Sequence, residues 1–149
     1  SDVCSSDLED PAREHKPKTP MQQFMETYSS MIDRVKSLGS TPVLLSLPVL
    51  DPERFFNFVT RGLDKANVLK WLGGTILSID RWHAMYNMAV FRLGAMKKVP
   101  VIDITSVFLE KKNYSEYICE DGIHPNERGH GLIEKAIMEF LQERRVALQ

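Results

Sequence analysis

Two short apolar segments, bounded by prolines or charged residues and separated by amphipathic stretches, constrain the fold most strongly. Residues 42–48 and 99–104 are apolar on both faces and too short to be independent helices, as strands inside a parallel sheet are. Around them, apolar residues recur every three or four positions, which is typical of helices with one buried face. This alternation predicts an α/β fold with parallel strands and helices on both faces of the sheet.

The helical periodicity predicts helices at residues 20–38, 52–59, 78–93 and 125–144, with residues 61–75 partly irregular and 105–112 a short connection. Thr19 is expected to cap the first helix, with Pro20 at its first position and Gln22 completing a capping box. Asp51 is expected to cap the second helix. Gly129 and Gly131 indicate close backbone approach at the start of the last helix.

Two strands do not complete such a sheet, because each needs a parallel neighbour on both sides. We therefore expect strands to be missing upstream, so that residues 9–149 form the carboxy-terminal part of a single domain. Residues 1–8 lack an initiator methionine and any periodicity. They resemble a translated sequencing-adapter remnant and are treated as a non-native scar.

Composition excludes several classes of function. A net charge of -1 gives no electrostatic basis for binding nucleic acid or an anionic membrane. The apolar runs fall far short of the roughly 18–20 residues that a membrane span needs. Cys4 and Cys119 form neither a disulfide framework nor a metal-ligand spacing. Oligomeric state and cellular location stay open.

An acid and a histidine three residues apart stand just before the last helix. Pro125 disfavours helical backbone at His124, and its own fixed φ suits a first helical turn. His124 is therefore expected on a loop, with Asp121 one short turn upstream. The carboxylate can accept a hydrogen bond from one ring nitrogen and leave the other free to act on a nucleophile. Asp121 and His124 are the candidate catalytic acid and base.

Residues 121–126 (Asp-Gly-Ile-His-Pro-Asn), followed by Gly129 and His130, resemble the last signature block of the SGNH (GDSL) hydrolase superfamily. Weaker motifs precede it in order: Leu47-Pro48, Tyr86-Asn87 and Val101-Ile102-Asp103. The resemblance covers about residues 19–143 and implies a flavodoxin-like, three-layer α/β/α fold. It also implies a serine esterase or lipase without metal or cofactor, with Asp121 and His124 in its triad. The implied substrate is an acetylated sugar, a short acyl ester or a lysophospholipid.

In that family a Gly-Asp-Ser turn after the first strand supplies the nucleophile, and a Gly and an Asn complete the oxyanion hole. None of these is visible here, since Ser5-Ser6-Asp7-Leu8 has Ser and Asp transposed and follows no strand. Because losing a nucleophile costs about 10⁶ in turnover, the chain as given is expected to be inactive.

Two other classes remain open: a non-catalytic module that binds carbohydrate or protein, and a metal-dependent hydrolase. The latter would use His124 and His130 with Glu120 or Asp121. Among other polar residues, His83 is predicted to lie on a helix surface and Ser46 to pack beneath the next helix. Asp103 is predicted to cap the turn that follows it.

Overall fold

The computed structural model describes residues 19–146, with side chains up to residue 144. The elements are, in order, α2 (Met21–Ser37), β1 (Leu44–Leu45), α3 (Pro52–Val59), α4 (Lys65–Trp71), α5 (Leu77–Lys97), β2 (Val101–Ile102), α6 (Ile104–Leu109), the 3₁₀ helix η1 (Tyr114–Tyr117) and α7 (Glu127–Val146). The predictions for residues 1–18, including the adapter-like start and Cys4, fall outside the described residues. Over the described range, no helix is both long enough and apolar enough to cross a membrane.

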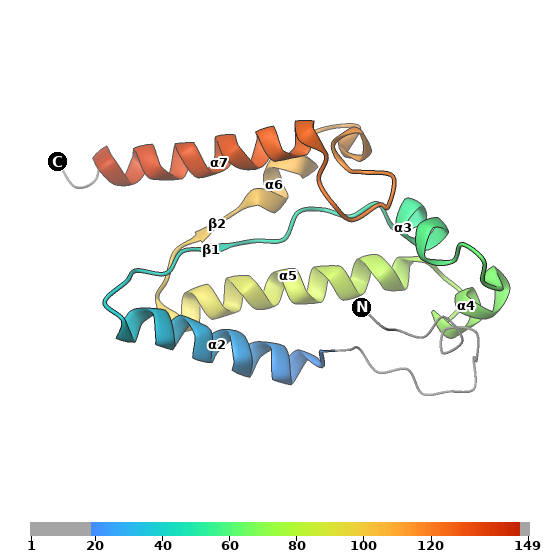
Figure 1. The fold of residues 1–149 in the computed structure, drawn as a ribbon, viewed down its shortest axis with the longest axis horizontal. Helices are drawn as coiled ribbons and strands as arrows, with labels where there is room; N and C mark the ends of the chain where they lie inside the picture. The colour runs from blue at the N-terminus through green and yellow to red at the C-terminus, as the bar shows by residue number, and fades with distance from the viewer. Residues whose placement is uncertain (1–18, 147–149) are drawn as a thin grey trace.

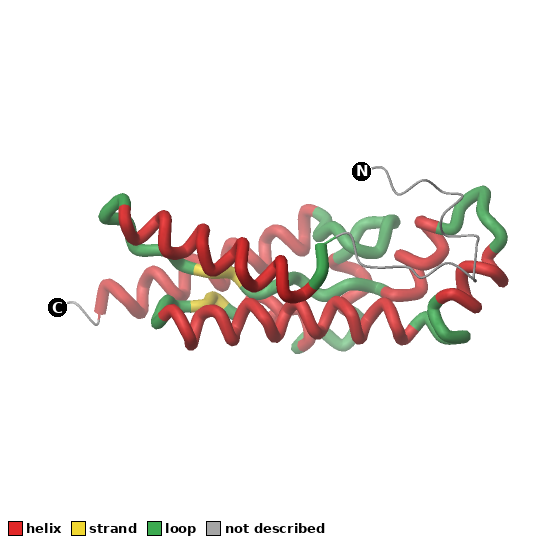
Figure 2. The backbone as a smooth tube through the Cα atoms, turned by 90° about the horizontal axis from the view of Figure 1, so that it is seen from below, coloured by secondary structure: helices red, strands yellow, loops and turns green. Residues whose placement is uncertain are grey.

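The two strands pair in parallel, with Leu44 opposite Val101 and Leu45 opposite Ile102. Helices α2 and α5 lie on one side of the strands and α7 on the other (Figure 1). The prediction of an α/β fold with parallel strands is confirmed. Each strand is only two residues long, and helices make up most of the chain (Figure 2). Regular pairing therefore covers only part of each apolar run.

Both faces of the strands contribute to a core, which explains why the two segments lack polar alternation. Leu44 packs toward α2 and α5, whereas Ile102 packs toward α7. The first core contains Ile32, Leu44, Val90, Leu93 and Val99, and the second Ile102, Ile104 and Ala136. Leu45 departs from this pattern, since 37% of its surface is exposed.

A buried polar network ties the carboxyl ends of the strands to α5. The side chain of Asn87 accepts a hydrogen bond from Leu47 N at 2.7 Å and donates one to Thr105 Oγ1 at 2.9 Å. Ser46, only 1% exposed, accepts from Thr105 N. Asp103 caps α6 by accepting from the backbone N–H of the third residue of that helix. Asp103 therefore has the predicted capping role, whereas Ser46 bonds to the start of α6 and not, as predicted, to the next helix along the chain.

The helix starts agree with the predictions at α3 and disagree at α2. Asp51 caps α3 by accepting from Arg54 N at 3.0 Å. At α2 the cap position is Pro20, with no side-chain hydrogen bond, so the predicted capping box is wrong. Gln22 instead donates to Glu26 along the helix surface. The backbone carbonyl of Thr19 is engaged by the hydroxyl of a tyrosine in α5, a tertiary contact that local sequence does not reveal.

Helix α7 begins two residues later than predicted. Pro125 forms an antiparallel bridge with Ile118 and is thereby held outside the helix. Asn126 becomes the cap, accepting from Gly129 N at 3.1 Å. A Cβ on Gly129 would lie 2.3 Å from Tyr117 O, whereas one on Gly131 would meet nothing within 4 Å. The predicted close approach therefore holds for Gly129 alone.

This contrast predicts opposite effects of one substitution at two positions of the same helix. Gly129→Ala should lower the free energy of unfolding by about 1–3 kcal/mol, because the first turn of α7 must move away from η1. Gly131→Ala should leave it unchanged or raise it by up to about 1 kcal/mol, since alanine favours helix where space is open. Urea denaturation of both variants measures the difference. Equal effects would show that the contact with η1 does not constrain α7.

Candidate active site

Asp121 and His124 belong to the tight loop between η1 and α7. The segment that leads into α7 lies toward the end of the molecule to which the parallel strands run (Figure 1). Cys119 N donates to His124 O at 2.8 Å, and Gly122 N donates to Cys119 O at 3.0 Å. These bonds, with the Ile118–Pro125 bridge, close the loop on itself. Ligands of open α/β sheets bind beyond the carboxyl ends of the strands, and the loop stands in that position.

The loop brings the two predicted site residues into direct contact. His124 Nδ1 lies 2.5 Å from Asp121 Oδ2. The other carboxylate oxygen accepts from the backbone N–H groups of Ile123 and His124, both at 3.1 Å. The side chain of Asp121 is 20% exposed and that of His124 is 76% exposed. The carboxylate is thus fixed at both oxygens, while the imidazole projects into solvent.

These hydrogen bonds set the ionisation of the acid. The bond from the His124 side chain is the largest cause that lowers the pKa of Asp121 from 3.8 to about 2, and the N–H of Ile123 adds to it. An ionised carboxylate only accepts hydrogen bonds, so the neutral imidazole carries its proton on Nδ1. Nε2 is then left with a free lone pair, as a general base requires.

Helix α3 holds the loop from the opposite side. Asp51 N, at the start of α3, donates to Gly122 O at 2.8 Å. Gly122 has a φ of +78°, and a Cβ there would lie 2.3 Å from Phe55 N. Only glycine fits both the left-handed backbone and this close approach. The residue after the candidate acid is therefore fixed to a helix some 70 positions earlier in sequence by backbone contact.

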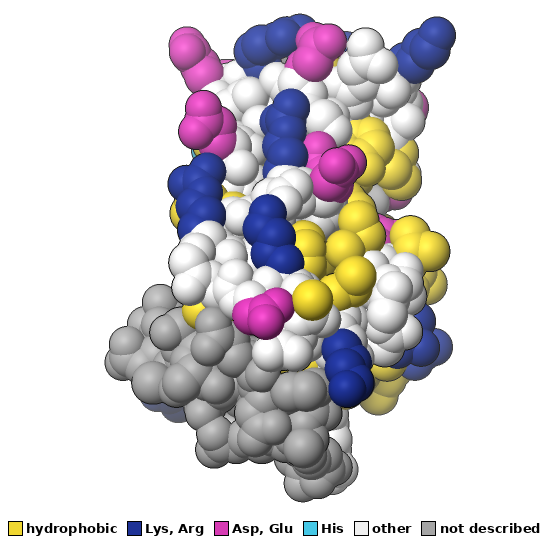
Figure 3. Space-filling model, turned by 90° about the vertical axis from the view of Figure 1, so that its right-hand side faces the viewer, with side chains coloured by type: hydrophobic (Ala, Val, Ile, Leu, Met, Phe, Trp, Pro, Cys, Tyr) yellow, Lys and Arg dark blue, Asp and Glu magenta, His cyan; other side chains and the backbone are white. Residues whose placement is uncertain are grey.

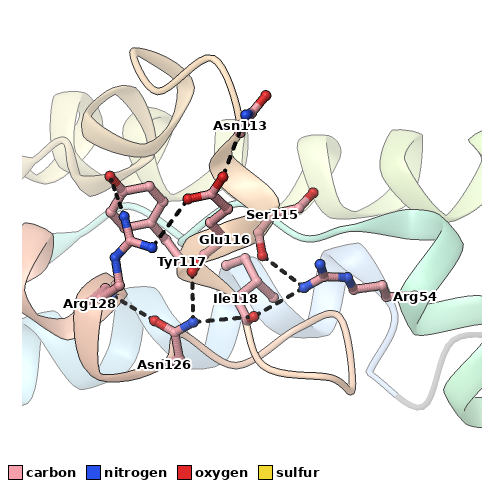
Figure 4. Close-up of polar contacts among 9 residues, drawn as sticks. Arg54, Asn113, Ser115, Glu116, Tyr117, Ile118, Asn126 and Arg128 are labelled. Carbon is pink, nitrogen blue, oxygen red and sulfur yellow. Dashed lines mark hydrogen bonds and ion pairs between the residues drawn. The ribbon is translucent and has the colours of Figure 1, made fainter.

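Side chains complete this clamp at the junction of η1 and α7. Figure 4 shows Arg54 of α3 donating to Ser115 O at 2.7 Å and to Ile118 O at 3.3 Å. Asn126 donates to Glu116 O at 2.9 Å while capping α7. The guanidinium of Arg128 stacks over the ring of Tyr117 at 4.6 Å. Both ends of the loop are thus anchored to structured elements.

Three residues that position the site are not among those predicted from the sequence: Arg54, Gly122 and Asn126. Asn126 had a local signal, since an asparagine directly before a helical stripe is a common cap. The other two act through contacts between α3 and the loop, which no local pattern encodes.

Two cavities flank the loop. One, of about 860 Å³, is bordered by Arg54, Arg61, Cys119, Glu120 and Asp121. The other, of about 600 Å³, lies between α3, α4 and the start of α5 and reaches Ile123. Figure 3 views this end of the molecule and shows apolar side chains gathered among basic and acidic ones. The site therefore offers both a charged and an apolar surface next to the Asp121–His124 pair.

Two other histidines differ in their surroundings. His83 is half-buried and lines the second cavity, so its prediction as a simple surface residue is wrong. Burial lowers the pKa of His83, opposed by Asp80 and by a hydrogen bond with the carbonyl of Pro48. His130 is exposed on α7. Across residues 19–146, no three His, Cys, Asp or Glu side chains cluster as a metal site would require, so His124, His130 and Glu120 do not form one.

Comparison with known proteins agrees with the fold. No family model matches the chain, and no curated protein matches it. Among solved structures, a lipase/acylhydrolase from Enterococcus faecalis superposes with a TM-score of 0.55 at 17% sequence identity, over 94% of this chain and 58% of that one. The chain thus spans a little over half of that protein's length. At this identity the likeness is one of fold: the described residues share the α/β architecture of the matched part of that structure.

Proposed function

We propose that the chain is the carboxy-terminal part of a serine ester hydrolase of the SGNH type, in which Asp121 and His124 are the triad acid and base. The observation that carries this proposal is the 2.5 Å contact between Asp121 Oδ2 and His124 Nδ1, with the imidazole 76% exposed. The likeness in fold to a lipase/acylhydrolase supports it at a coarser level. A surface histidine without a catalytic role does not require a carboxylate fixed at both oxygens.

In the proposed mechanism the serine comes from a segment upstream of this sequence. As its oxygen attacks the ester carbonyl, His124 Nε2 takes the hydroxyl proton and Asp121 stabilises the resulting imidazolium. The bond to the alcohol then breaks, and the same proton passes to the departing oxygen. Water, deprotonated by His124, next attacks the acyl-enzyme, and the proton returns to serine as the acid is released. Asp121 stays ionised throughout.

The same proposal extends to the fold. Further parallel strands would pair with the free edge of β1 and complete a flavodoxin-like sheet with helices on both faces. Leu45 is 37% exposed, whereas its neighbours in the run are buried or half-buried, so this face of β1 has room for elements of a larger sheet to cover it. The 149-residue chain alone would lack the nucleophile and the oxyanion hole and would have no esterase activity.

His124→Ala in the longer protein should reduce kcat on a p-nitrophenyl ester by at least about 10⁴-fold, because the serine loses its base. His130→Ala is the matched control, since His130 is exposed on α7 and outside the dyad; its turnover should stay at the wild-type level. Initial rates of both variants give the comparison. Wild-type turnover by His124→Ala would remove this residue from the mechanism.

Acid titration tests the dyad without any turnover. The folded pKa of Asp121, about 2, lies below its ordinary 3.8, so its stabilising contribution should be complete above about pH 4 and lost as the pH falls toward 2. The carboxyl carbon of Asp121, followed by NMR in the 149-residue chain, should titrate near 2, and nearer 3.8 in His124→Ala.

Asp121→Asn is the control for stability, because it removes this carboxyl while the other acids continue to titrate. The difference in free energy of unfolding between wild type and this variant should shrink as the pH falls from 4 to 2. A difference independent of pH would mean that the hydrogen bond with His124 is not formed in solution.

A further inference from the structure

The second cavity beside the loop is built almost entirely from hydrocarbon. Its walls come from the segment before α3, from α3 itself, from the end of α4 and from the start of α5. Its apolar lining includes Leu50, Phe55, Trp71, Ile79, Trp82 and Ile123. The cavity of about 600 Å³ falls within the roughly 300–1,000 Å³ of small-molecule sites.

Two polar side chains of the lining, those of Ser78 and His83, are already engaged with the protein. Ser78 Oγ donates to Leu72 O at 2.6 Å. His83 has a hydrogen bond with the carbonyl of Pro48 and an attractive interaction with Asp80. Arg81 contributes the remaining charge and is exposed. A polyhydroxylated ligand would find few hydrogen-bonding groups here to replace its water, whereas an alkyl chain would lose only its contact with water.

The cavity adjoins the Asp121–His124 loop through Ile123. This residue lines the cavity, donates its N–H to Asp121 Oδ1 and directly precedes His124. On the other wall, Leu50 precedes Asp51, whose N–H holds Gly122. A molecule seated in the cavity therefore contacts the same loop that positions the base. The other cavity, beside Arg54, is bordered by charged side chains instead. Arg54 itself is already bonded to the carbonyls of Ser115 and Ile118.

We propose that this cavity binds the unbranched hydrocarbon chain of an ester substrate, on either its acyl or its alcohol side. The inference rests on the proposed ester hydrolysis and narrows its substrate class. An acetyl group would leave the cavity empty, and an acetylated sugar would place hydroxyl groups against tryptophan and isoleucine. Esters with chains of several carbons, such as medium-chain acyl esters or lysophospholipids, fit the volume and the lining.

The two tryptophans provide a readout that needs no turnover. The chain contains only two, Trp71 and Trp82, and both line the cavity. Titration of the 149-residue chain with decanoate, below its micellar concentration, should give a saturable change in tryptophan emission, and acetate should give none. From butyrate to decanoate, the dissociation constant should fall about fourfold per methylene, until the cavity is filled.

A matched pair of variants tests the location. Ile79→Asp places a charge in the lining and should weaken decanoate binding at least tenfold, whereas Leu77→Asp, on an exposed position of the same helix, should bind as wild type. Ile79→Phe keeps the wall apolar but reduces the volume, so it should weaken decanoate more than butyrate. If Ile79→Asp fails to fold, Ile79→Phe still tests whether decanoate binds in this cavity. No saturable emission change with decanoate, or equal binding by Ile79→Phe and wild type across the series, would overturn the proposal.

Kinetic measurements on the longer protein then show whether the acyl or the alcohol side of the ester occupies the cavity. One substrate series lengthens the acyl chain with a fixed alcohol, and the other lengthens the alcohol with a fixed acyl group. kcat/KM should rise with length in one series and lose that rise in Ile79→Asp. If the protein hydrolyses no ester but binds decanoate at the tryptophans, the proposed function fails and the apolar site stands. Hydrolysis of acetyl esters alone, without any benefit from length, would refute the apolar site and keep the esterase.

Discussion

The close approach of Gly122 to the first turn of α3 is the constraint on which the site depends. The hydrogen bond from Asp51 N to Gly122 O leaves no room for a side chain, and the positive φ excludes most residues other than glycine. Because Gly122 directly follows Asp121, this contact fixes the backbone from which the Asp121 side chain extends. The carboxylate then fixes the imidazole through Nδ1. The position of the exposed His124 ring thus depends, through Asp121, on the backbone packing between Gly122 and α3.

The parts of the site that sequence could predict are those whose cause is local. Asp121 and His124 are three residues apart, and Pro125 keeps His124 out of the helix, so their contact needs no distant residue. The boundary of α7 was predicted wrongly for the opposite reason: Pro125 is drawn out of the helix by its bridge to Ile118. Strand length and the clamp from Arg54 likewise depend on which segments meet in space, which periodicity does not encode.

The polar residues near the strand ends divide into two groups with different tasks. Ser46, Asn87 and Thr105 are bonded to each other or to the backbone, so their hydrogen-bonding capacity is used within the fold. They join α5 to the strands and stiffen the base beneath the site. Both carboxylate oxygens of Asp121 also accept hydrogen bonds, but one donor is the His124 ring, whose second nitrogen stays available. Burial thus marks the supporting residues, and an exposed end marks the residue available for chemistry.

The arrangement of loop and cavity also bears on how a substrate would be oriented. A general base contributes only when the reacting group is held within hydrogen-bond reach. Ile123 belongs to both the cavity wall and the loop that carries His124, and its N–H is bonded to the acid. A hydrocarbon chain bound against Ile123 would therefore be held at a fixed position relative to the imidazole, because the short loop that carries both residues is anchored at its two ends. In the proposed complex, the residue that contacts the hydrocarbon is also bonded to the carboxylate that holds the imidazole, so one short segment positions both.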